Sequence, residues 1–458
     1  MNLAGRIALA VVIGVLAWAT GARAEQRFPP PEFESDYQMP AMTTPPPRAL
    51  VWQYIDVGVL AVALGVAVWL VHRKRSRTGV LVLSVLSLIY FGFYRTGCIC
   101  PIGAPQNVLF GLLNPNYAVP WPVVGLFVLP VVVALFAGRA FCAGVCPHGA
   151  LQDLVLLKPV QVPLWLERGL SLVPFLFLGA GLAFAATGSI FLICKLDPFV
   201  PLFRRHGPTW SLLLGAAFLL VGTVVGRPFC RFICPYGALL RLAAMVTKWR
   251  VRVTPDLCTQ CKLCEQSCPF GALRQPSSGT PDPRTLPVER RRLLALLLLW
   301  PALIAVGAWI GAHLTVPASR LHPTVRLAEF YLEHKKHPKQ YPIQSPEALS
   351  LLRAEQTWPE LQAAALQLRH RIGLSMKLFG GWAGLVVGAG LIGLAVRRSR
   401  TDYEPDSGAC LACARCFESC PQELLRRGVP IPLPTAASAA QPQSVVANLP
   451  TAAQTTNR

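Results

Sequence analysis

The sequence predicts a mainly α-helical, polytopic membrane protein with a two-cluster module of the bacterial ferredoxin type. Hydrophobic residues make up 53% of the 458 residues and charged residues only 14%, whereas a soluble protein has roughly 25% charged residues. The mean hydropathy is +0.46, and seven apolar segments are long enough to cross a bilayer. Two cysteine runs with the spacing C-x2-C-x2-C-x3-C-P predict the iron–sulfur module.

Residues 1–24 are expected to be a secretory signal peptide. Arg6 precedes the apolar stretch 7–20, and residues 22–24 (Ala-Arg-Ala) have the form of a cleavage site. An uncleaved membrane anchor is the alternative. In both cases the Pro-rich segment 25–48 is expected to begin on the periplasmic side of a bacterial inner membrane.

Seven helices are then expected to cross the membrane. Their segments are 49–71, 79–96, 121–138, 170–193, 209–226, 293–315 and 378–396. The first five would form a core domain over residues 49–250. Strict alternation from a periplasmic start places 98–120, which has no charged residue, outside the cytoplasm. The same alternation places 227–292, which is rich in Arg and Lys, inside it, as the positive-inside rule requires.

The charge of most loops agrees with this arrangement, although Lys195, Arg204 and Arg205 make the expected outer loop 194–208 basic. The net charge is +21, a value that would also suit a nucleic-acid-binding protein. The basic residues gather, however, at the ends of apolar segments, as at 73–75, 290–292 and 397–398. Because this distribution is typical of cytoplasmic loops, we expect a membrane surface and no nucleic acid as the partner of these charges.

Residues within the apolar segments favour structure over transport. The last segment has glycines at four-residue spacing, Gly380, Gly384 and Gly388, which predicts close packing against a neighbouring helix. Asp56 is the one acidic residue well inside a segment. Since transporters need ionisable residues in the membrane interior, the sequence gives little support to a transport function.

The two ferredoxin-type runs predict two [4Fe–4S] clusters. Their members are Cys258, Cys261, Cys264 and Cys268 before Pro269, and Cys410, Cys413, Cys416 and Cys420 before Pro421. In bacterial ferredoxins three cysteines of a run bind one cluster and the fourth binds the other. The expected ligand sets are therefore Cys258, Cys261, Cys264 and Cys420 for cluster 1, and Cys410, Cys413, Cys416 and Cys268 for cluster 2. In an alternative, each run closes around its own cluster. Zinc is disfavoured because structural zinc sites pair two CxxC units.

A membrane hairpin separates the two runs. The first ferredoxin half (251–292) precedes the hairpin 293–396, whose periplasmic insert 316–377 has helical patterns, and the second half (397–427) follows it. Because two crossings return the chain to the side it left, both halves are expected in the reducing cytoplasm. There they would fold together as one module. Residues 428–458 are expected to be a disordered cytoplasmic tail.

A second cysteine pattern recurs in the membrane core. Segments 138–150 and 226–238 share the form Gly-Arg-x-Phe-Cys-x3-Cys-Pro-x-Gly-Ala. Their cysteines are Cys142, Cys146, Cys230 and Cys234. Since residues i and i+4 share a helix face, each pair is expected to present two thiolates at the membrane boundary. The four thiolates are candidates for an additional iron–sulfur cluster, or for the wall of a quinol pocket beneath the ferredoxin module.

Other residues leave the outer side open to two interpretations. Cys98, Cys100 and Cys194 are expected there, as part of a redox centre or as a structural disulfide with one free thiol. His313 and His370 lie near helix ends and suggest haem ligands. Because haem needs paired axial ligands, we expect these histidines to be ordinary polar residues.

With Phe-Cys-x3-Cys-Pro twice, followed by ferredoxin cysteines, the chain resembles membrane-bound iron–sulfur proteins of the NosR/NapH type, over roughly residues 78–275 and 400–421. The resemblance implies an inner-membrane polyferredoxin whose cluster ligands are the eight ferredoxin cysteines. NosR-like proteins also have an extracytoplasmic domain with covalent flavin before their helices. Residues 25–48 leave no room for that domain and lack its Ser/Thr-Gly-Ala-Thr-like motif. Any flavin is therefore expected on a partner, with no covalent flavin on this chain.

The expected function is electron transfer by a subunit of an oxidoreductase system, and not by a self-contained enzyme. The resemblance implies transfer between the quinone pool or cytoplasmic donors and a periplasmic flavoprotein or cytochrome. A hydrocarbon core of about 30 Å is too thick for one electron step, so transmembrane transfer requires an intermediate carrier. The alternative function is a redox sensor or a maturation factor for a metalloenzyme that uses the same clusters.

Overall fold

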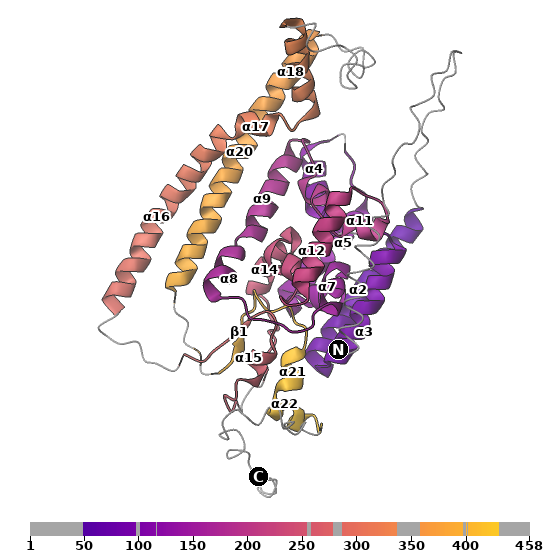
Figure 1. Ribbon diagram of the computed structural model, residues 1–458, viewed down its shortest axis with the longest axis vertical. Helices are drawn as coiled ribbons and strands as arrows, with labels where there is room; N and C mark the ends of the chain where they lie inside the picture. Colours follow the sequence, from indigo (N-terminus) through magenta and orange to yellow (C-terminus); the bar gives the residue numbers. More distant parts are fainter. Residues whose placement is uncertain are drawn as a thin grey trace, which may run out of the picture.

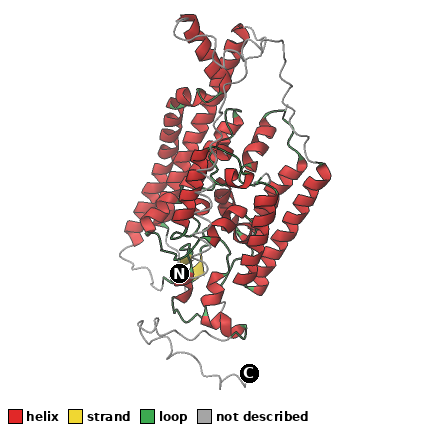
Figure 2. Ribbon diagram, turned by 45° about the vertical axis from the view of Figure 1, so that its right-hand side comes forward, coloured by secondary structure: helices red, strands yellow, loops and turns green. Residues whose placement is uncertain are grey.

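The computed structural model describes residues 49–97, 101–115, 117–253, 258–277, 286–336, 358–396, 400 and 402–429. The expected signal peptide, the Pro-rich segment 25–48 and all but the first two residues of the expected tail lie outside the described residues. The described chain is mainly helical, and its helices stand roughly side by side along the long axis (Figure 1, Figure 2). We call the end that carries the cysteine runs the ferredoxin end, and the opposite end the far end.

All seven expected crossing segments are helical, but they differ in length. Five are long and apolar enough to cross a membrane: residues 50–74, 77–94, 164–186, 287–313 and 359–395. They comprise α2 (Leu50–Trp69) with η1 (Leu70–Lys74), α3 (Arg77–Ser87) with η2 (Leu88–Tyr94), α8 (Leu164–Leu170) with α9 (Val173–Ala186), α16 (Leu286–His313) and α20 (Trp358–Ala395). The two other expected crossings form the shorter apolar helices α5 (Trp121–Ala137) and α12 (Thr209–Gly222).

Each of these shorter helices is followed by two short helices that form a turn inside the bundle. After α5 come α6 (Ala140–Gly144) and α7 (Pro147–Leu154), and after α12 come α13 (Pro228–Phe232) and α14 (Pro235–Met245). The end of α7 lies at the ferredoxin end, because Asp153 pairs with Arg77 and the same arginine donates to the Cys413 carbonyl. The start of α7 lies deeper, because His148 contacts Phe203, which also contacts Phe93 at the far end of η2.

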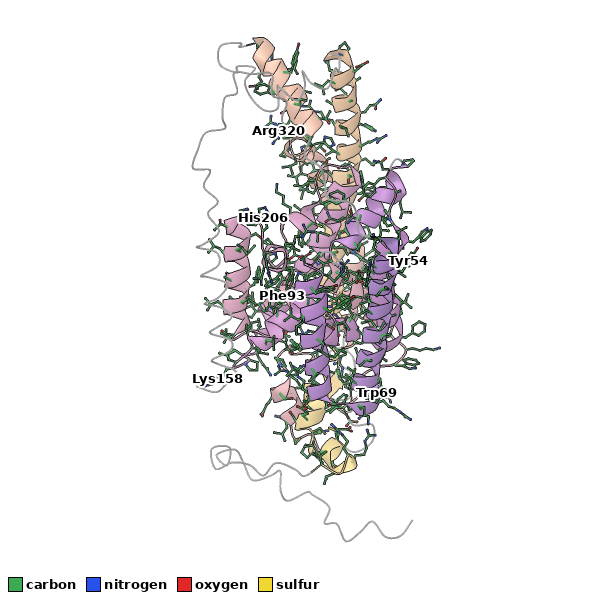
Figure 3. The ribbon with its side chains drawn as sticks, turned by 90° about the vertical axis from the view of Figure 1, so that its right-hand side faces the viewer. Tyr54, Trp69, Phe93, Lys158, His206 and Arg320 are labelled. Carbon is green, nitrogen blue, oxygen red and sulfur yellow. The ribbon has the colours of Figure 1, made fainter. Side chains whose placement is uncertain are left out.

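Short helices also enter the bundle from the far end. They are α4 (Ala104–Leu113), α10 (Leu192–Lys195) and α11 (Val200–Arg204). The buried Gln106 joins two of these segments, since its amide donates to the Gly181 carbonyl and accepts from the Ile193 N–H at 3.0 Å. Figure 3 shows His206 and Tyr54 toward the far end and Trp69 and Lys158 toward the ferredoxin end. The middle of the bundle thus contains loops from both ends.

The hairpin of α16 and α20 lies along one side of the bundle and carries α17 (Thr315–Ser319) and α18 (Pro323–Lys336) at the far end (Figure 1). The helices approach closely at glycines, as the glycine spacing predicted. A Cβ added at Gly380 would lie 2.0 Å from the Gly307 carbonyl oxygen, and one at Gly384 would lie 2.2 Å from that of Leu303. The hairpin is attached to α9, where Trp382 donates to the Phe175 carbonyl at 2.9 Å.

The two ferredoxin halves lie together at the base of the molecule (Figure 1). The first half contributes α15 (Leu263–Ser267) and β1 (Leu273–Arg274), and the second contributes β2 (Glu404–Pro405), α21 (Arg415–Ser419) and α22 (Pro421–Arg426). The two strands pair antiparallel, with Leu273 opposite Pro405 and Arg274 opposite Glu404. Segments that the hairpin separates in the sequence therefore form one module.

Candidate metal centre

Two cavities in the ferredoxin module are each lined by four cysteines. The first cysteine group consists of Cys258, Cys261, Cys264 and Cys420. The second cysteine group consists of Cys268, Cys410, Cys413 and Cys416. Each cavity thus takes three cysteines from one half and the fourth from the other half. The structure brings together the residues that the sequence assigned to each [4Fe–4S] cluster.

The backbone of the two cysteine runs adopts the same unusual conformation. Gln260 and Lys262 have positive φ angles of 54° and 62°, and Ala412 and Ala414, at the matching positions, have angles of 54° and 64°. Residues with side chains rarely occupy this left-handed region, and such strain is usually kept at functional sites. Successive N–H groups in turns of this kind form concave sites for anions, including iron–sulfur clusters. The donor set and the backbone therefore fit iron–sulfur clusters.

The thiol groups within each of the two cysteine groups lie close together. Burial, together with the nearby thiols of Cys261 and Cys420, raises the pKa of Cys264 to about 12. Burial likewise raises the pKa of Cys410 to about 12, with a further contribution from Cys413. Thiolates packed this closely repel one another, so a bound cation is needed to hold them together in the charged form.

The membrane quartet, Cys142, Cys146, Cys230 and Cys234, lies inside the bundle, and all four side chains are buried. The expectation that each C-x3-C pair shares one helix face is wrong. Cys142 lies in α6, whereas Cys146 is the N-cap of α7 with an extended backbone (φ −70°, ψ 118°). Cys230 and Cys234 are divided in the same way between α13 and α14. Pro147 and Pro235 explain the break, because proline favours the first turn of a new helix and an extended residue before it.

The arginine of each repeat crosses to the other repeat. Arg227 is fully buried and donates to the carbonyl groups of Cys142 and Ala143. A Cβ at Gly149 would lie 3.0 Å from Arg227 Nη1, and a Cβ at Gly237 would lie 3.2 Å from Arg139 Nη2. The two repeats thus interlock around an approximate two-fold arrangement, and this crossing brings the members of the quartet together.

Gln152 fixes the position of one quartet thiol. Its side chain is fully buried, donates to Cys230 Sγ at 3.1 Å and accepts from the Phe229 N–H at 3.0 Å. On the opposite repeat, the Gly237 N–H donates to Cys234 Sγ at 3.3 Å. Sequence reasoning assigned no role to Gln152, Arg139 or Arg227. The Gly-Arg pair before each Phe-Cys was the signal available for the two arginines.

Asp153 anchors the quartet to the ferredoxin module. Its buried carboxylate pairs with Arg77, with Arg227 at 3.3 Å and with Arg415 at 3.4 Å. Burial raises the pKa of this carboxyl, but the charges of Arg227 and Arg77 outweigh burial and hold the pKa well below its usual range. Asp153 is therefore a permanent anion that joins three chain segments, one of which belongs to the second cysteine run.

The quartet and the second cysteine group share one hydrophobic core. All four quartet cysteines and Cys413 belong to this core, and Cys268 and Cys410 pack against it. Arg227 is close enough to both Cys230 and Cys413 to interact with their charges. Cys258, Cys264 and Cys420 of the first group lie in a separate cluster nearer the base, against which Cys268 and Cys416 also pack. The three groups therefore follow one another from the base into the bundle.

Cys194 is the part of the expected outer site that the structure describes. Its sulfur would lie 2.5 Å from a Cβ added at Gly103, so the thiol is next to the loop that follows Cys98 and Cys100. Those two cysteines lie outside the described residues. His148 and Asp197 connect this region to the quartet, because the imidazole Nε2 lies 3.1 Å from both carboxylate oxygens and both residues are buried.

The remaining candidate ligands lie apart from these groups. His313 is exposed and packs against the ring of Trp309 at 4.5 Å, and His370 is exposed on α20. Asp56 is buried, but it pairs with Arg95 at 2.8 Å and accepts from the Tyr90 hydroxyl. Among the described residues, no three His, Cys, Asp or Glu side chains are arranged to hold a single metal ion.

Comparison with known proteins agrees with this geometry. One family model, described as a 4Fe-4S binding domain, matches residues 119–172 and again 207–254, which contain the two C-x3-C-P repeats. A second model with the same description matches residues 251–274 and contains the first ferredoxin-type run. No solved structure matches the chain.

Three curated relatives show the group to which the chain is related. Protein NirI of Paracoccus denitrificans is 28% identical over 274 residues, 54% of this chain and 37% of NirI. The regulatory protein NosR of Pseudomonas aeruginosa is 28% identical over 44% of this chain and 30% of NosR. The putative electron transport protein YccM of Escherichia coli is 25% identical over 37% of this chain and 52% of YccM. The chain is a NosR/NapH-like membrane iron–sulfur protein.

The match to these relatives is partial in length. The chain spans between 30% and 52% of the three proteins named. What this NosR/NapH-like protein shares with them is its membrane association and its 4Fe–4S binding domains, which support iron–sulfur electron transfer.

Proposed function

We propose that this NosR/NapH-like protein carries electrons from donors at its ferredoxin end into the membrane, through iron–sulfur clusters held by three cysteine groups. The observation that carries the proposal is the continuous packing of these groups. The second cysteine group and the membrane quartet share one hydrophobic core, with Arg227 between Cys413 and Cys230. The first cysteine group lies at the base, adjoining the second.

In this proposal, the first and second cysteine groups each hold one [4Fe–4S] cluster, and the membrane quartet holds a third. Such clusters, when bound, accept and release single electrons. The family model whose description is 4Fe-4S binding matches both repeats that supply the quartet, and this supports the third assignment. The residues of the chain supply the thiolates, the left-handed turns that direct N–H groups and the buried guanidinium groups that compensate negative charge.

We further propose that the ferredoxin end faces the cytoplasm of a bacterial inner membrane. The basic segment 290–292 lies near the start of α16, at this end of the molecule (Figure 1), which suits the cytoplasmic side. Cytoplasmic thiols also remain reduced and available to iron. The electron partners in this proposal are the quinone pool and a periplasmic flavoprotein or cytochrome. The far-end thiol Cys194 is then part of the outer site.

Anaerobic purification of the full chain, followed by iron and sulfide counting with EPR, tests the proposal. Three [4Fe–4S] clusters give about twelve irons per chain, and two give about eight. The double variant Cys142→Ser/Cys230→Ser should then lose about four irons and retain the EPR signals of the ferredoxin module. An unchanged iron count in this variant would contradict the third cluster, and zinc in place of iron would contradict the whole proposal.

The name of one relative favours a second candidate function. NosR is described as a regulatory protein, so this chain is also a candidate redox sensor or maturation factor that uses the same clusters. Affinity purification from membranes distinguishes the two functions. A periplasmic flavoprotein or cytochrome among the bound proteins supports electron transfer, whereas an oxidase or a metal-delivery protein supports maturation.

A further inference from the structure

The two C-x3-C-P repeats differ at one position that carries charge. Asp153 lies seven residues after Cys146, and Arg241 lies seven residues after Cys234. In the first repeat, the crossing arginine is Arg227, and the Asp153 carboxylate receives it together with two further guanidinium groups. In the second repeat the crossing arginine is Arg139, and the matching position holds a second cation. Where the first repeat has a carboxylate, the second repeat therefore has an arginine.

Arg139 and Arg241 line a cavity of about 70 Å³ between the second repeat and the ferredoxin module. The charged residues that line it are Arg139, Arg168, Arg231, Arg241, Arg274 and Glu167. Glu167 pairs with Arg231 at 3.0 Å, and Arg274 is 3.6 Å from Asp406. None of the ion pairs in the described part of the chain involves Arg139 or Arg241. The cavity thus has more positive charge than its acidic neighbours neutralise.

Some N–H groups of the arginines that line this cavity have no hydrogen-bond partner in the described chain. Arg139 is only 6% exposed, and its Nη1 donates to the Gly408 carbonyl at 3.3 Å, but its Nε has no hydrogen-bond partner among the described residues. Arg241 Nε and Arg231 Nη1 are also buried without a partner in the described chain. Burying a donor without a partner is costly, and more so for a charged group. Three guanidinium groups that line this cavity therefore each keep one buried N–H without a partner in the described chain, as Arg227 and Arg415 also do.

A quartet cluster does not explain this arrangement. Its negative charge would act on Arg139 and Arg227 alike, since the two are related by the repeat. Arg241 has no such counterpart, because Asp153 occupies its position in the first repeat. An anion in the cavity would form ion pairs with Arg139 and Arg241. In the first repeat, the Asp153 carboxylate forms such pairs with three arginines.

The geometry points to a phosphate-type oxyanion bound between Arg139 and Arg241, in the role that Asp153 plays in the first repeat. Guanidinium groups bind phosphate oxygens in pairs, and basic pockets at a membrane boundary bind acidic lipid headgroups. Phe175, Phe232 and Phe270 give the cavity an apolar wall, which suits a phosphate that belongs to a phospholipid. A free phosphate has the same recognition chemistry.

This oxyanion joins the second repeat to the ferredoxin module. Arg274 and Ala409, from the two ferredoxin halves, line the same cavity as Arg139 and Arg241. Asp153 makes the matching connection on the first repeat through Arg415. Cys230 of the quartet also lines this cavity, so a quartet cluster would adjoin the oxyanion, whose role is that of a structural ligand.

The test uses the full chain, purified in neutral detergent and delipidated, with the thermal unfolding midpoint as the readout. At saturation, phosphatidylglycerol should raise the midpoint by about 5 °C relative to phosphatidylcholine. Inorganic phosphate, compared with chloride at equal ionic strength, shows whether a free anion has the same effect. A response to either source supports the site, and its pattern identifies the source. If neither source raises the unfolding midpoint, the oxyanion site is overturned. Stabilisation by a neutral quinone alone would overturn it as well.

Two substitutions at Arg241 sharpen the test. Arg241→Asp gives the second repeat the carboxylate that Asp153 supplies in the first. This variant should be stable without added anion and should lose at least about tenfold in anion affinity. Arg241→Lys keeps the charge and should respond to the anion, which guards against a variant that merely fails to fold. Arg250→Asp, an exposed charge reversal outside the cavity, is the control and should respond like the wild type. A normal response from Arg241→Asp would overturn the inference.

Discussion

His148 Nε2 lies 3.1 Å from both carboxylate oxygens of Asp197, and both side chains are buried. The pair joins a turn that enters from the ferredoxin end to a loop that enters from the far end. Asp197 also accepts from the N–H groups of Phe199 and Val200, where α11 begins. One ion pair thus connects the surroundings of the membrane quartet to the segment that carries Cys194.

Removing both members of this pair should cost less than the sum of the two single removals. His148→Ala leaves the Asp197 carboxylate buried without its cation, and we expect a loss of about 3–5 kcal/mol in unfolding free energy. The double variant His148→Ala/Asp197→Ala leaves neither charge and should lose less than the sum of the two single variants. Reversible unfolding of the detergent-solubilised chain measures the cycle. Strictly additive losses would show that the two residues do not interact.

The Asp153 carboxylate should be required for docking of the ferredoxin module. Asp153→Asn leaves Arg227, Arg77 and Arg415 without their anion, and a loss of about 3–5 kcal/mol is expected. Because the pKa of Asp153 lies below its usual value, its contribution is complete above about pH 4 and is lost only as the pH falls further. Limited proteolysis should cut the second ferredoxin half faster in this variant.

The matched control for Asp153 is a surface carboxylate. Glu329 pairs with Arg369 at 2.5 Å and with Arg320 at 3.2 Å, and both arginines are largely exposed. Glu329→Gln should therefore cost at most about 1 kcal/mol. Equal losses for Asp153→Asn and Glu329→Gln would count against the proposed anchor.

The exchange of ligands between the two cysteine runs has a direct test. In a background that carries Cys258→Ala and Cys261→Ala, the first cluster is lost. Adding Cys268→Ser should then remove iron from the second cluster as well, because Cys268 lines the second cavity. Adding Cys420→Ser instead should have no further effect on iron content, since Cys420 lines the first cavity. The reverse outcome would mean that each run closes around its own cluster.

The α16–α20 hairpin should not tolerate a methyl group at its closest point. Gly380→Ala places a Cβ about 2 Å from backbone atoms of α16, and overpacking of this kind costs about 1–3 kcal/mol. Gly393 lies on the same helix, and a Cβ added there would have nothing within 4 Å, so Gly393→Ala should be neutral or slightly stabilising. Thermal unfolding of the two variants provides the comparison.

The sequence was sufficient for the cysteine runs and for the seven apolar helices, because ligand spacing and hydrophobicity are local properties. It did not reveal that α6 and α13 turn back into the bundle. Apolar composition shows that a segment avoids water, but it does not show whether the segment crosses the membrane or turns back within the bundle. The proline after Cys146 was a readable signal that a new helix begins there. The pairing of Arg227 with Asp153 was not readable, because it depends on the crossing of the two repeats.

The division of the cysteine groups has a consequence for biogenesis. Each cavity in the ferredoxin module takes cysteines from both halves of the chain. The second half is synthesised only after the α16–α20 hairpin, so neither cavity can be complete before that hairpin has been made. A ribosome-bound chain that ends before Cys410 lacks Cys420 of the first cavity and three of the four cysteines of the second. Iron loading of either cavity is therefore expected only after the hairpin has been translated, and a chain truncated within the hairpin lacks a complete ferredoxin cavity.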